Sequence, residues 1–251
     1  IYGVTDEFKK MVIENNLKMQ FLELYNIDRK VLKMLKDIMI IAPEKIEAES
    51  MRMIESEMDK KALESFTAEE LKVVKRCIHT SADFDYQTNL VFGNDALNRG
   101  FEAFKRGAFI ITDTKMALAG INKTSLQVLN SDARCFISDE DIIKEAKERG
   151  VTRACVSMER AFELSKTTDK AIVIAVGNAP TALIRLYELI EQGFKPDLII
   201  GVPVGFVNVV ESKNLILETK VPHIVAKGRK GGSNIAAAII NAIIYQLKRL
   251  D

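Results

Sequence analysis

Two continuous apolar runs, residues 171–176 and 198–202, constrain the fold of this chain more than any other feature. Neither run alternates apolar with polar residues, which is typical of strands that helices cover on both faces. A helical pattern over residues 180–192 lies between them. A strand, a helix and a strand in this order, joined by right-handed crossovers, form a parallel sheet. The sequence therefore predicts a three-layer, doubly wound α/β fold with a mainly parallel sheet.

Further segments extend this pattern along the chain. Apolar runs at residues 109–112, 134–137 and 221–226 predict three more strands, and Ser138 is expected to cap the helix after the second of them. Helices are expected over residues 46–60 and 233–250. We expect residues 43–251 to form one α/β domain.

The first 42 residues have a different character. They are rich in Lys, Glu, Met and Leu and contain no glycine after Gly3. Their apolar spacing predicts two short amphipathic helices, and Pro43 ends the second because proline disfavours a helical residue before it. Residues 1–42 are therefore expected to form an N-terminal helical extension that packs on the domain or supports a dimer.

Composition and charge exclude several classes of protein. A formal net charge of +1 over 251 residues provides no global basic field, so nucleic acid is not an expected partner. No apolar run reaches the roughly 18 residues that span a membrane, and the N-terminus has no signal-peptide pattern. The three cysteines are odd in number and stand outside metal-ligand spacing. We expect a protein of the reducing cytoplasm, with no metal site and no membrane partner.

One of the two histidines, His79, stands in a block of polar residues. Residues 67–70, Thr-Ala-Glu-Glu, match a capping box that begins a helix, so His79 falls near the last turn of that helix. The helix dipole and the neighbouring Asp83 and Asp85 favour the charged imidazole there. Thr80 and Ser81 follow directly and could orient a ligand. His79 is a candidate general acid; the alternative is a surface histidine at a helix end.

Three turns after predicted strands are candidates for ligand binding, because open α/β sheets bind ligands at the carboxyl ends of their strands. The turn at residues 177–181 offers backbone N–H groups, Asn178 and the Thr181 hydroxyl. The turn at residues 201–208 includes Val204 and the flexible Gly205. The turn at residues 227–234 combines three cations with a glycine-rich helix start. Its candidate residues are Lys227, Arg229, Lys230, Gly231 and Ser233.

These turns match neither of the two standard nucleotide-binding motifs. Any one of them could simply connect a strand to a helix, but three in succession, one of them tribasic, favour a large anionic ligand. Asp113 follows a predicted strand and is either a helix N-cap or a ligand contact. His223 lies within a predicted apolar strand, which favours a hydrogen-bonded core histidine over a catalytic one.

Taken together, these blocks resemble the precorrin-8X methylmutase family of cobalamin biosynthesis. The resemblance extends from about Pro43 to the C-terminus, and the first 42 residues fall outside it. The segments that carry it include Ile-His-Thr-Ser-Ala-Asp-Phe-Asp (78–85), Gly-Asn-Ala-Pro-Thr-Ala-Leu (177–183), Gly-Val-Pro-Val-Gly-Phe-Val (201–207), Glu-Ser-Lys (211–213) and Lys-Gly-Arg-Lys-Gly-Gly-Ser (227–233).

The resemblance implies an isomerase that moves a methyl group from C-11 to C-12 of a corrin precursor, with His79 as the proton donor. It implies no cofactor, since the bond change is internal to the substrate, and it suggests a homodimer. The implied substrate is a tetrapyrrole with several carboxylate arms, in agreement with the anion-binding turns. Whether that substrate contains cobalt stays open, as does a different class of function, a corrinoid-binding or hand-over protein without chemistry.

Overall fold

The computed structural model describes residues 37–39 and 41–248. The chain divides into two compact units, residues 1–49 and residues 50–251. The helical extension expected over residues 1–42 lies almost wholly outside the described residues. The second unit contains every strand of the described chain.

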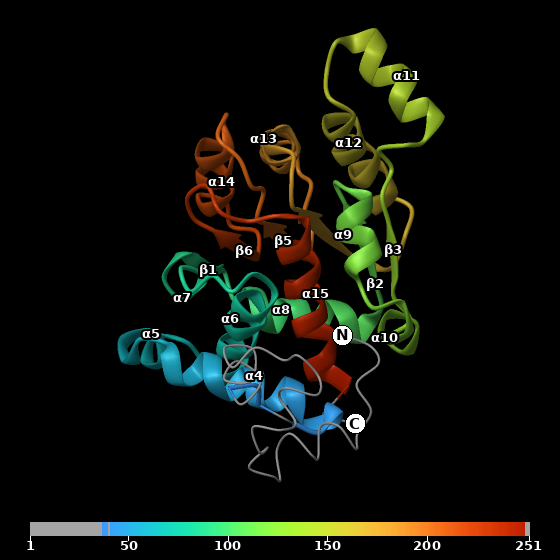
Figure 1. The fold of residues 1–251 in the computed structure, drawn as a ribbon. Coiled ribbons are helices and arrows are strands. Elements are labelled where there is room, and N and C mark those ends of the chain that lie inside the picture. The colour runs from blue at the N-terminus through green and yellow to red at the C-terminus, as the bar shows by residue number, and fades with distance from the viewer. Residues whose placement is uncertain (1–36, 40, 249–251) are drawn as a thin grey trace, which may run out of the picture. The chain divides into compact units, whose positions relative to one another are not determined.

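A six-stranded sheet organises this unit, in the order β1-β6-β5-β4-β2-β3 (Figure 1). All neighbouring strands are parallel except the edge pair β1 and β6, which is antiparallel. The strands are β1 (Leu90–Gly93), β2 (Ala108–Thr112), β3 (Asp132–Arg134), β4 (Ala171–Val176), β5 (Leu198–Gly201) and β6 (His223–Ala226).

Helices alternate with these strands along the chain. The first ones are α4 (Pro43–Glu57), α5 (Lys60–Ser65), α6 (Ala68–Ser81), α7 (Tyr86–Asn89) and α8 (Ala96–Arg106). The middle ones are α9 (Lys115–Gly120), α10 (Lys123–Val128), α11 (Glu140–Arg149) and α12 (Arg153–Ser165). The last ones are α13 (Pro180–Glu191), α14 (Val209–Leu217) and α15 (Ser233–Lys248).

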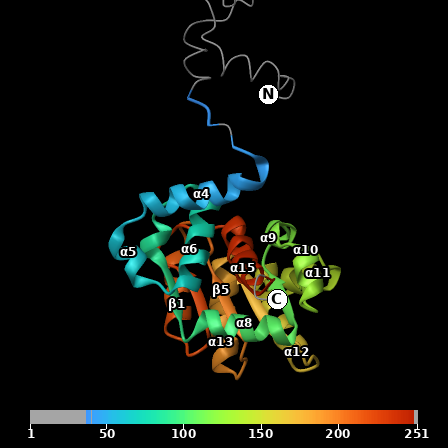
Figure 2. The ribbon, with the colours of Figure 1, turned by 90° about the horizontal axis from the view of Figure 1, so that it is seen from below.

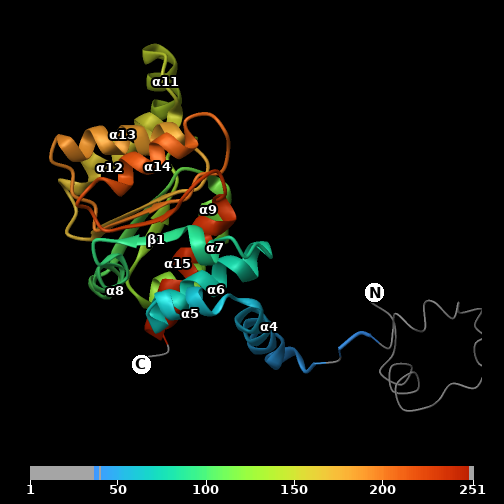
Figure 3. The same cartoon turned by 90° about the vertical axis from the view of Figure 1, so that its left-hand side faces the viewer.

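Helices cover both faces of the sheet, which confirms the three-layer fold. Along β4, Val173 and Ala175 pack with α6, α8 and α15, whereas Ile172 and Ile174 pack with α12, α13 and α14. Figure 3 shows these two helical layers on opposite sides of the strands, and Figure 2 looks onto α6, α8 and α15. All six residues of β4 are buried, which explains why this run lacks polar alternation. In the described part of the chain, no helix is long and apolar enough to cross a membrane.

The structure differs from the sequence-based expectation in four places. The strand expected at 134–137 is β3 at 132–134; Phe136 is buried in the α11–α13 layer without strand pairing. The N-cap of the following helix, α11, is Asp139 and not Ser138 as expected. The helix expected over 46–60 is α4, which runs from Pro43 to Glu57, and a separate short helix, α5, follows it. The antiparallel strand β1 was not predicted, because only Leu90 of its four residues is buried and the pattern is too short to stand out.

Candidate functional site

His79 lies in the last turn of α6, on an exposed side of the helix. The predicted capping box is present: the Thr67 hydroxyl accepts the Glu70 N–H, and the Glu70 carboxylate accepts the Thr67 N–H. At the other end, Ala82 adopts a left-handed conformation with a φ of 54° and stops the helix. The structure thus confirms the helical position on which the interpretation of His79 as a candidate acid depends.

The hydroxyl groups of Thr80 and Ser81 are exposed beside His79 but already donate hydrogen bonds. Thr80 donates to the carbonyl of Arg76, and Ser81 donates to the carbonyl of Cys77, both at 2.8 Å. A donor that bonds to its own helix is not available to a ligand. In this arrangement the Thr80 hydroxyl can accept a hydrogen bond from a ligand, whereas the Ser81 oxygen also accepts the Asp83 N–H at 3.3 Å.

The antiparallel strand β1 brings the His79 block to the edge where the parallel strands end. Leu90, the first residue of β1, pairs with Ala226, the last residue of β6. The Lys227 N–H then donates to the carbonyl of Asn89 at 2.8 Å. The segment before β1 and the turn after β6 therefore lie side by side, although about 140 residues separate them in the sequence.

An ion pair joins these two segments. Lys230 Nζ lies 2.7 Å from Oδ2 of Asp83 and 2.5 Å from Oδ2 of Asp85. The hydrogen bond from Lys230 lowers the pKa of Asp83, and the same contact raises the pKa of Lys230. The partners are substantially exposed, so salt screens the attraction. Lys230 connects the tribasic turn to the His79 block.

The three cations of that turn do not form one cluster. Lys230 is paired with the two aspartates. The guanidinium carbon of Arg229 lies 5.4 Å from the ring centre of Phe206. Lys227 lines a hollow of about 550 Å³ beside α14, together with Glu218 and His223. Sequence proximity alone suggested a single tribasic receptor, but the fold directs the three side chains to different surroundings.

Asp113 serves neither as a helix cap nor as an exposed contact, which corrects the first of those expectations. It is 2% exposed, and the N-cap of α9 is Thr114, whose hydroxyl accepts the Ala117 N–H. The Asp113 carboxylate accepts hydrogen bonds of 2.7–2.8 Å from the N–H groups of residues 177, 178 and 179. Burial raises its pKa, whereas these three bonds favour the ionised form.

This arrangement also corrects the expectation for the turn at residues 177–181. The N–H groups expected to receive a ligand anion are occupied by the Asp113 carboxylate instead. The side chain of Asn178 is exposed, whereas the Thr181 hydroxyl bonds to that of Thr152 at 2.8 Å, on the α12–α13 side of the sheet. Asp113 thus acts as an internal anion that holds the end of β4 beside the end of β2.

The start of α15 packs closely against the same turns. The Ser233 hydroxyl lies 2.7 Å from that of Thr114, in hydrogen-bond contact. A Cβ atom on Gly177 would lie 2.6 Å from the Ser233 Cα, so only glycine permits this approach. The carboxyl ends of β2 and β4 and the start of α15 are therefore held in one rigid arrangement.

The turn after β5 presents apolar side chains next to the tribasic turn. Val204 is 48% exposed, and Phe206 and Val207 are each 79% exposed. Backbone bonds hold the two turns together: the Gly205 N–H donates to the Arg229 carbonyl at 3.2 Å, and the Gly232 N–H donates to the Val202 carbonyl at 2.8 Å. An exposed apolar surface of this kind suits a large apolar ring or another protein surface.

Lys213 belongs to the Glu-Ser-Lys segment (211–213) that carries the family resemblance, and the sequence predicted no role for it. Its side chain is wholly buried, and Nζ donates to the carbonyls of Gly228 and Lys230, each at 2.8 Å. Burial lowers the pKa of Lys213 to about 8. One signal was available: Val209, Ser212, Lys213 and Ile216 form the buried stripe of α14, so a lysine stands where the helical spacing demands a buried residue.

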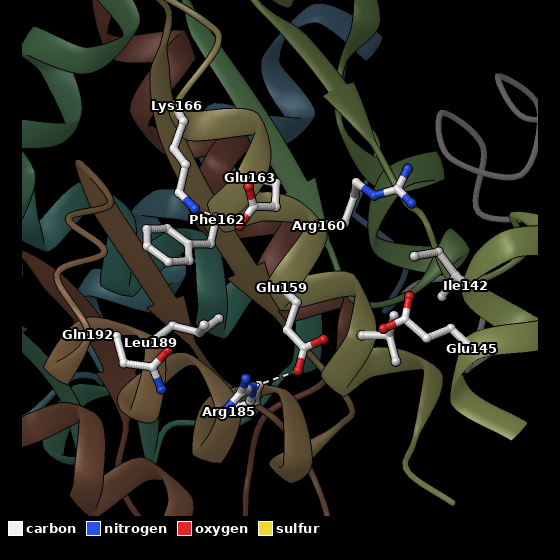
Figure 4. A pocket seen from close by; sticks show the side chains of 11 residues that line it. Ile142, Glu145, Glu159, Arg160, Phe162, Glu163, Lys166, Arg185, Leu189 and Gln192 are labelled. Carbon is white, nitrogen blue, oxygen red and sulfur yellow. Dashed lines mark hydrogen bonds and ion pairs between the residues drawn. The ribbon is translucent and has the colours of Figure 1, made fainter. Parts of the chain in front are cut away.

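Two other features lie apart from this edge. His223 is 3% exposed, and its Nδ1 lies 2.9 Å from the Val221 carbonyl, as expected of a core histidine; burial lowers its pKa. A second hollow of about 550 Å³ lies among α11, α12 and α13 (Figure 4). Its Glu159 is ion-paired with Arg149 and Arg185, so these charges already satisfy one another. Among the described residues, no group of three or more His, Cys, Asp or Glu side chains could hold a metal ion.

Comparison with known proteins finds a matching family and several relatives. The family profile described as precorrin-8X methylmutase matches residues 45–246. The cobalt-precorrin-8 methylmutase of Leptospira interrogans is 46% identical over 187 residues, which cover 72% of this chain and 84% of that protein. The protein of the same name from Priestia megaterium is 41% identical over 204 residues, covering 81% and 88%. The crystal structure of precorrin-8x methyl mutase from Thermus thermophilus superimposes with a TM-score of 0.74 at 38% identity, covering 80% of this chain and 95% of that one.

Proposed function

Since the chain belongs to the precorrin-8X methylmutase family, we propose that it moves a methyl group from C-11 to C-12 of precorrin-8 or its cobalt form. The product would be hydrogenobyrinate or cobyrinate. The chain is an isomerase of the methylmutase type that acts on a corrin precursor.

We propose His79 as the proton donor, and its position carries the proposal. Of the two histidines in the chain, His223 is buried in the core, whereas His79 is exposed in the last turn of α6, four residues before Asp83, which pairs with Lys230 of the turn after β6. Imidazole is the side chain best suited to proton transfer near neutral pH. Protonation of the conjugated ring system would leave an electron-poor carbon that the methyl group can reach. Because the reaction is an isomerisation, the proton that His79 delivers must be returned as the product forms.

The surroundings of His79 suit a flat macrocycle with carboxylate arms. Val204, Phe206 and Val207 offer an apolar surface for the ring. Arg229, at the rim of that surface, offers a guanidinium that can bind a carboxylate through two parallel hydrogen bonds. We propose that the substrate-binding set comprises Thr80, Ser81, Asn178, Val204, Gly205, Arg229, Lys230, Gly231 and Ser233, with weaker contributions from Lys227 and Thr181 and with Asp113 acting through the turn that it holds.

The test is single-turnover conversion of precorrin-8, with and without cobalt, followed by absorption spectroscopy in wild-type protein and His79→Asn. The variant should convert substrate on the order of 10²–10⁴ times more slowly, which is the usual contribution of a positioned acid. Its affinity for hydrogenobyrinate should stay within about threefold of wild type, because carboxylate contacts dominate binding. A variant rate above about a tenth of the wild-type rate would show that His79 is not the acid.

A corrinoid-binding protein without chemistry is the alternative class of function. The same measurement separates the two, because a hand-over protein would bind substrate and product yet leave the spectrum of bound precorrin-8 unchanged. Comparison of kcat/KM for the cobalt-containing and cobalt-free substrates identifies the preferred one.

A further inference from the structure

Lys213 is a buried cation whose charge has no anionic partner in the part of the chain that the structure describes. Its side chain is 0% exposed, and its two hydrogen bonds go to neutral carbonyl groups. A buried ammonium is costly unless an opposite charge compensates it. An uncompensated cation directly beneath an anion-binding turn therefore calls for an explanation.

The bonds from Lys213 determine which way the turn presents its amides. Lys213 draws the carbonyls of Gly228 and Lys230 inward. In a trans peptide the N–H of the next residue points opposite to the carbonyl, so the N–H groups of Arg229 and Gly231 point away from Lys213. In the described chain, no backbone or side-chain acceptor takes either N–H. An outward N–H group of a turn that no protein acceptor takes is able to donate to an anion.

The backbone at this turn has little freedom to rearrange. A Cβ atom on Gly231 would lie 2.1 Å from the Val202 carbonyl oxygen, so the turn after β5 presses against it. The Arg229 carbonyl is held by the Gly205 N–H. The outward amides are thus fixed in place before any ligand arrives, as effective electrostatic binding requires.

We propose that Lys213 is a positioning residue for substrate binding: its buried charge and its two hydrogen bonds aim the Arg229 and Gly231 amides at one carboxylate arm of the tetrapyrrole. This inference rests on the proposed function. The bound carboxylate supplies the anionic partner that Lys213 lacks, at a distance set by one layer of backbone. Lys213 itself does not touch the substrate, because its side chain is fully enclosed.

The Lys213 ammonium loses its proton within a pH range that can be measured, so the proposal predicts a specific pH dependence of affinity. Its pKa of about 8 reflects burial. A carboxylate on the turn favours the charged ammonium, so affinity is complete below that pH and declines as the pH rises through it. Titration of His223 falls at lower pH, because burial lowers its pKa. The other charged groups on α13, on α14 with its C-cap, and on the turn that Lys213 bonds are Arg185, Glu188, Glu191, Glu211, Glu218, Lys227, Arg229 and Lys230, the last of which is paired with Asp83 and Asp85.

The experiment measures the affinity of the full chain for hydrogenobyrinate between pH 6.5 and 9.5, in wild type, Lys213→Met and Lys213→Arg. Lys195→Met is the matched control, because Lys195 is exposed and precedes β5, at the opposite end of the strands from the turn. At pH 7, Lys213→Met should bind on the order of tenfold more weakly than wild type. The affinity of wild type should fall by the same factor above pH 8, whereas the affinity of Lys213→Met should not change with pH. Lys213→Arg keeps a permanent charge and should also bind without loss up to pH 9.5.

If Lys213→Met bound hydrogenobyrinate as tightly as wild type and with the same pH dependence, this inference would be wrong but the proposed function would not. No binding of hydrogenobyrinate to wild type would overturn the proposed function and this inference with it. Should the variants fail to fold, amide NMR of the wild type decides: the Arg229 and Gly231 resonances must move when hydrogenobyrinate is added at pH 7. Resonances that stay in place while others shift would refute the proposal.

Discussion

Lys230 Nζ lies 2.9 Å from Oδ1 of Asp83, a residue 147 positions earlier in the chain. This contact joins the segment that follows His79 to the turn that follows β6, and Asp85 strengthens it. A cation expected to bind substrate is therefore paired with two aspartates. Substrate binding must either displace the aspartates or use Lys230 as a tether for the turn.

Removal of the Lys230 charge tests how much this cation contributes to binding. Lys230→Gln should weaken hydrogenobyrinate binding by about two- to fivefold at low ionic strength, because exposed ion pairs are weak and two aspartates are left to repel the ligand. Asp83→Asn in the same background should restore part of the loss, since it removes one of those repelling charges. Titration followed by absorption at several salt concentrations measures this, with Lys195→Gln as the control. A loss that does not shrink as salt rises would contradict an electrostatic cause.

Arg229 should contribute more to affinity than Lys227. The Arg229 guanidinium lies over Phe206 at the apolar surface, whereas Lys227 lines the hollow beside α14 with Glu218. We expect Arg229→Gln to weaken binding on the order of tenfold, as for loss of one charge-assisted contact, and Lys227→Gln to have a clearly smaller effect. Equal losses in the two variants, measured by the same titration, would mean that the three cations act only through their summed charge.

Asp113 should matter chiefly for stability. Asp113→Asn places an NH₂ group against N–H donors of the turn after β4, and it removes the charge that all three bonds favour. The free energy of unfolding should fall by roughly 2–4 kcal/mol, the cost of leaving buried donors without an acceptor. Urea denaturation followed by circular dichroism measures it. Asp169→Asn, at an exposed position, is the control and should stay within about 0.5 kcal/mol of wild type. A similarly small effect of Asp113→Asn would mean that the turn does not depend on this carboxylate.

The exposed apolar turn after β5 also leads us to expect a two-fold homodimer. Phe206 and Val207 are each 79% exposed, which is unusual for large apolar side chains unless they meet a ligand or another protein surface. Closed two-fold dimers are the commonest assemblies of this kind. Light scattering should show a mass twice that of the 28.1 kDa chain, and Phe206→Glu should shift the equilibrium toward monomer. A wild-type protein that stays at 28.1 kDa at micromolar concentration would refute the dimer.

Local and continuous patterns account for what could be predicted without a structure. The capping box at Thr67 locates the start of α6 and hence the helical position of His79, because all of its contacts lie within one turn of helix. The unbroken apolar run of β4 reveals a strand covered on both faces. Strand order along the chain then places the three glycine-bearing turns at one edge of the sheet. Such features depend on residues a few positions apart, so the sequence displays them directly.

The tertiary structure alone decided which groups remain available at that edge. Asp113 occupies the N–H groups of the turn at residues 177–179, 64 to 66 residues away, and Lys230 is paired with Asp83 across 147 residues. Lys213 reaches the carbonyls of Gly228 and Lys230, 15 and 17 residues away, from the buried side of α14. Each of these contacts depends on how separate strands and helices pack. A donor or acceptor looks equally free in the sequence whether or not a distant partner satisfies it in the fold, and only the packed structure shows which partners meet.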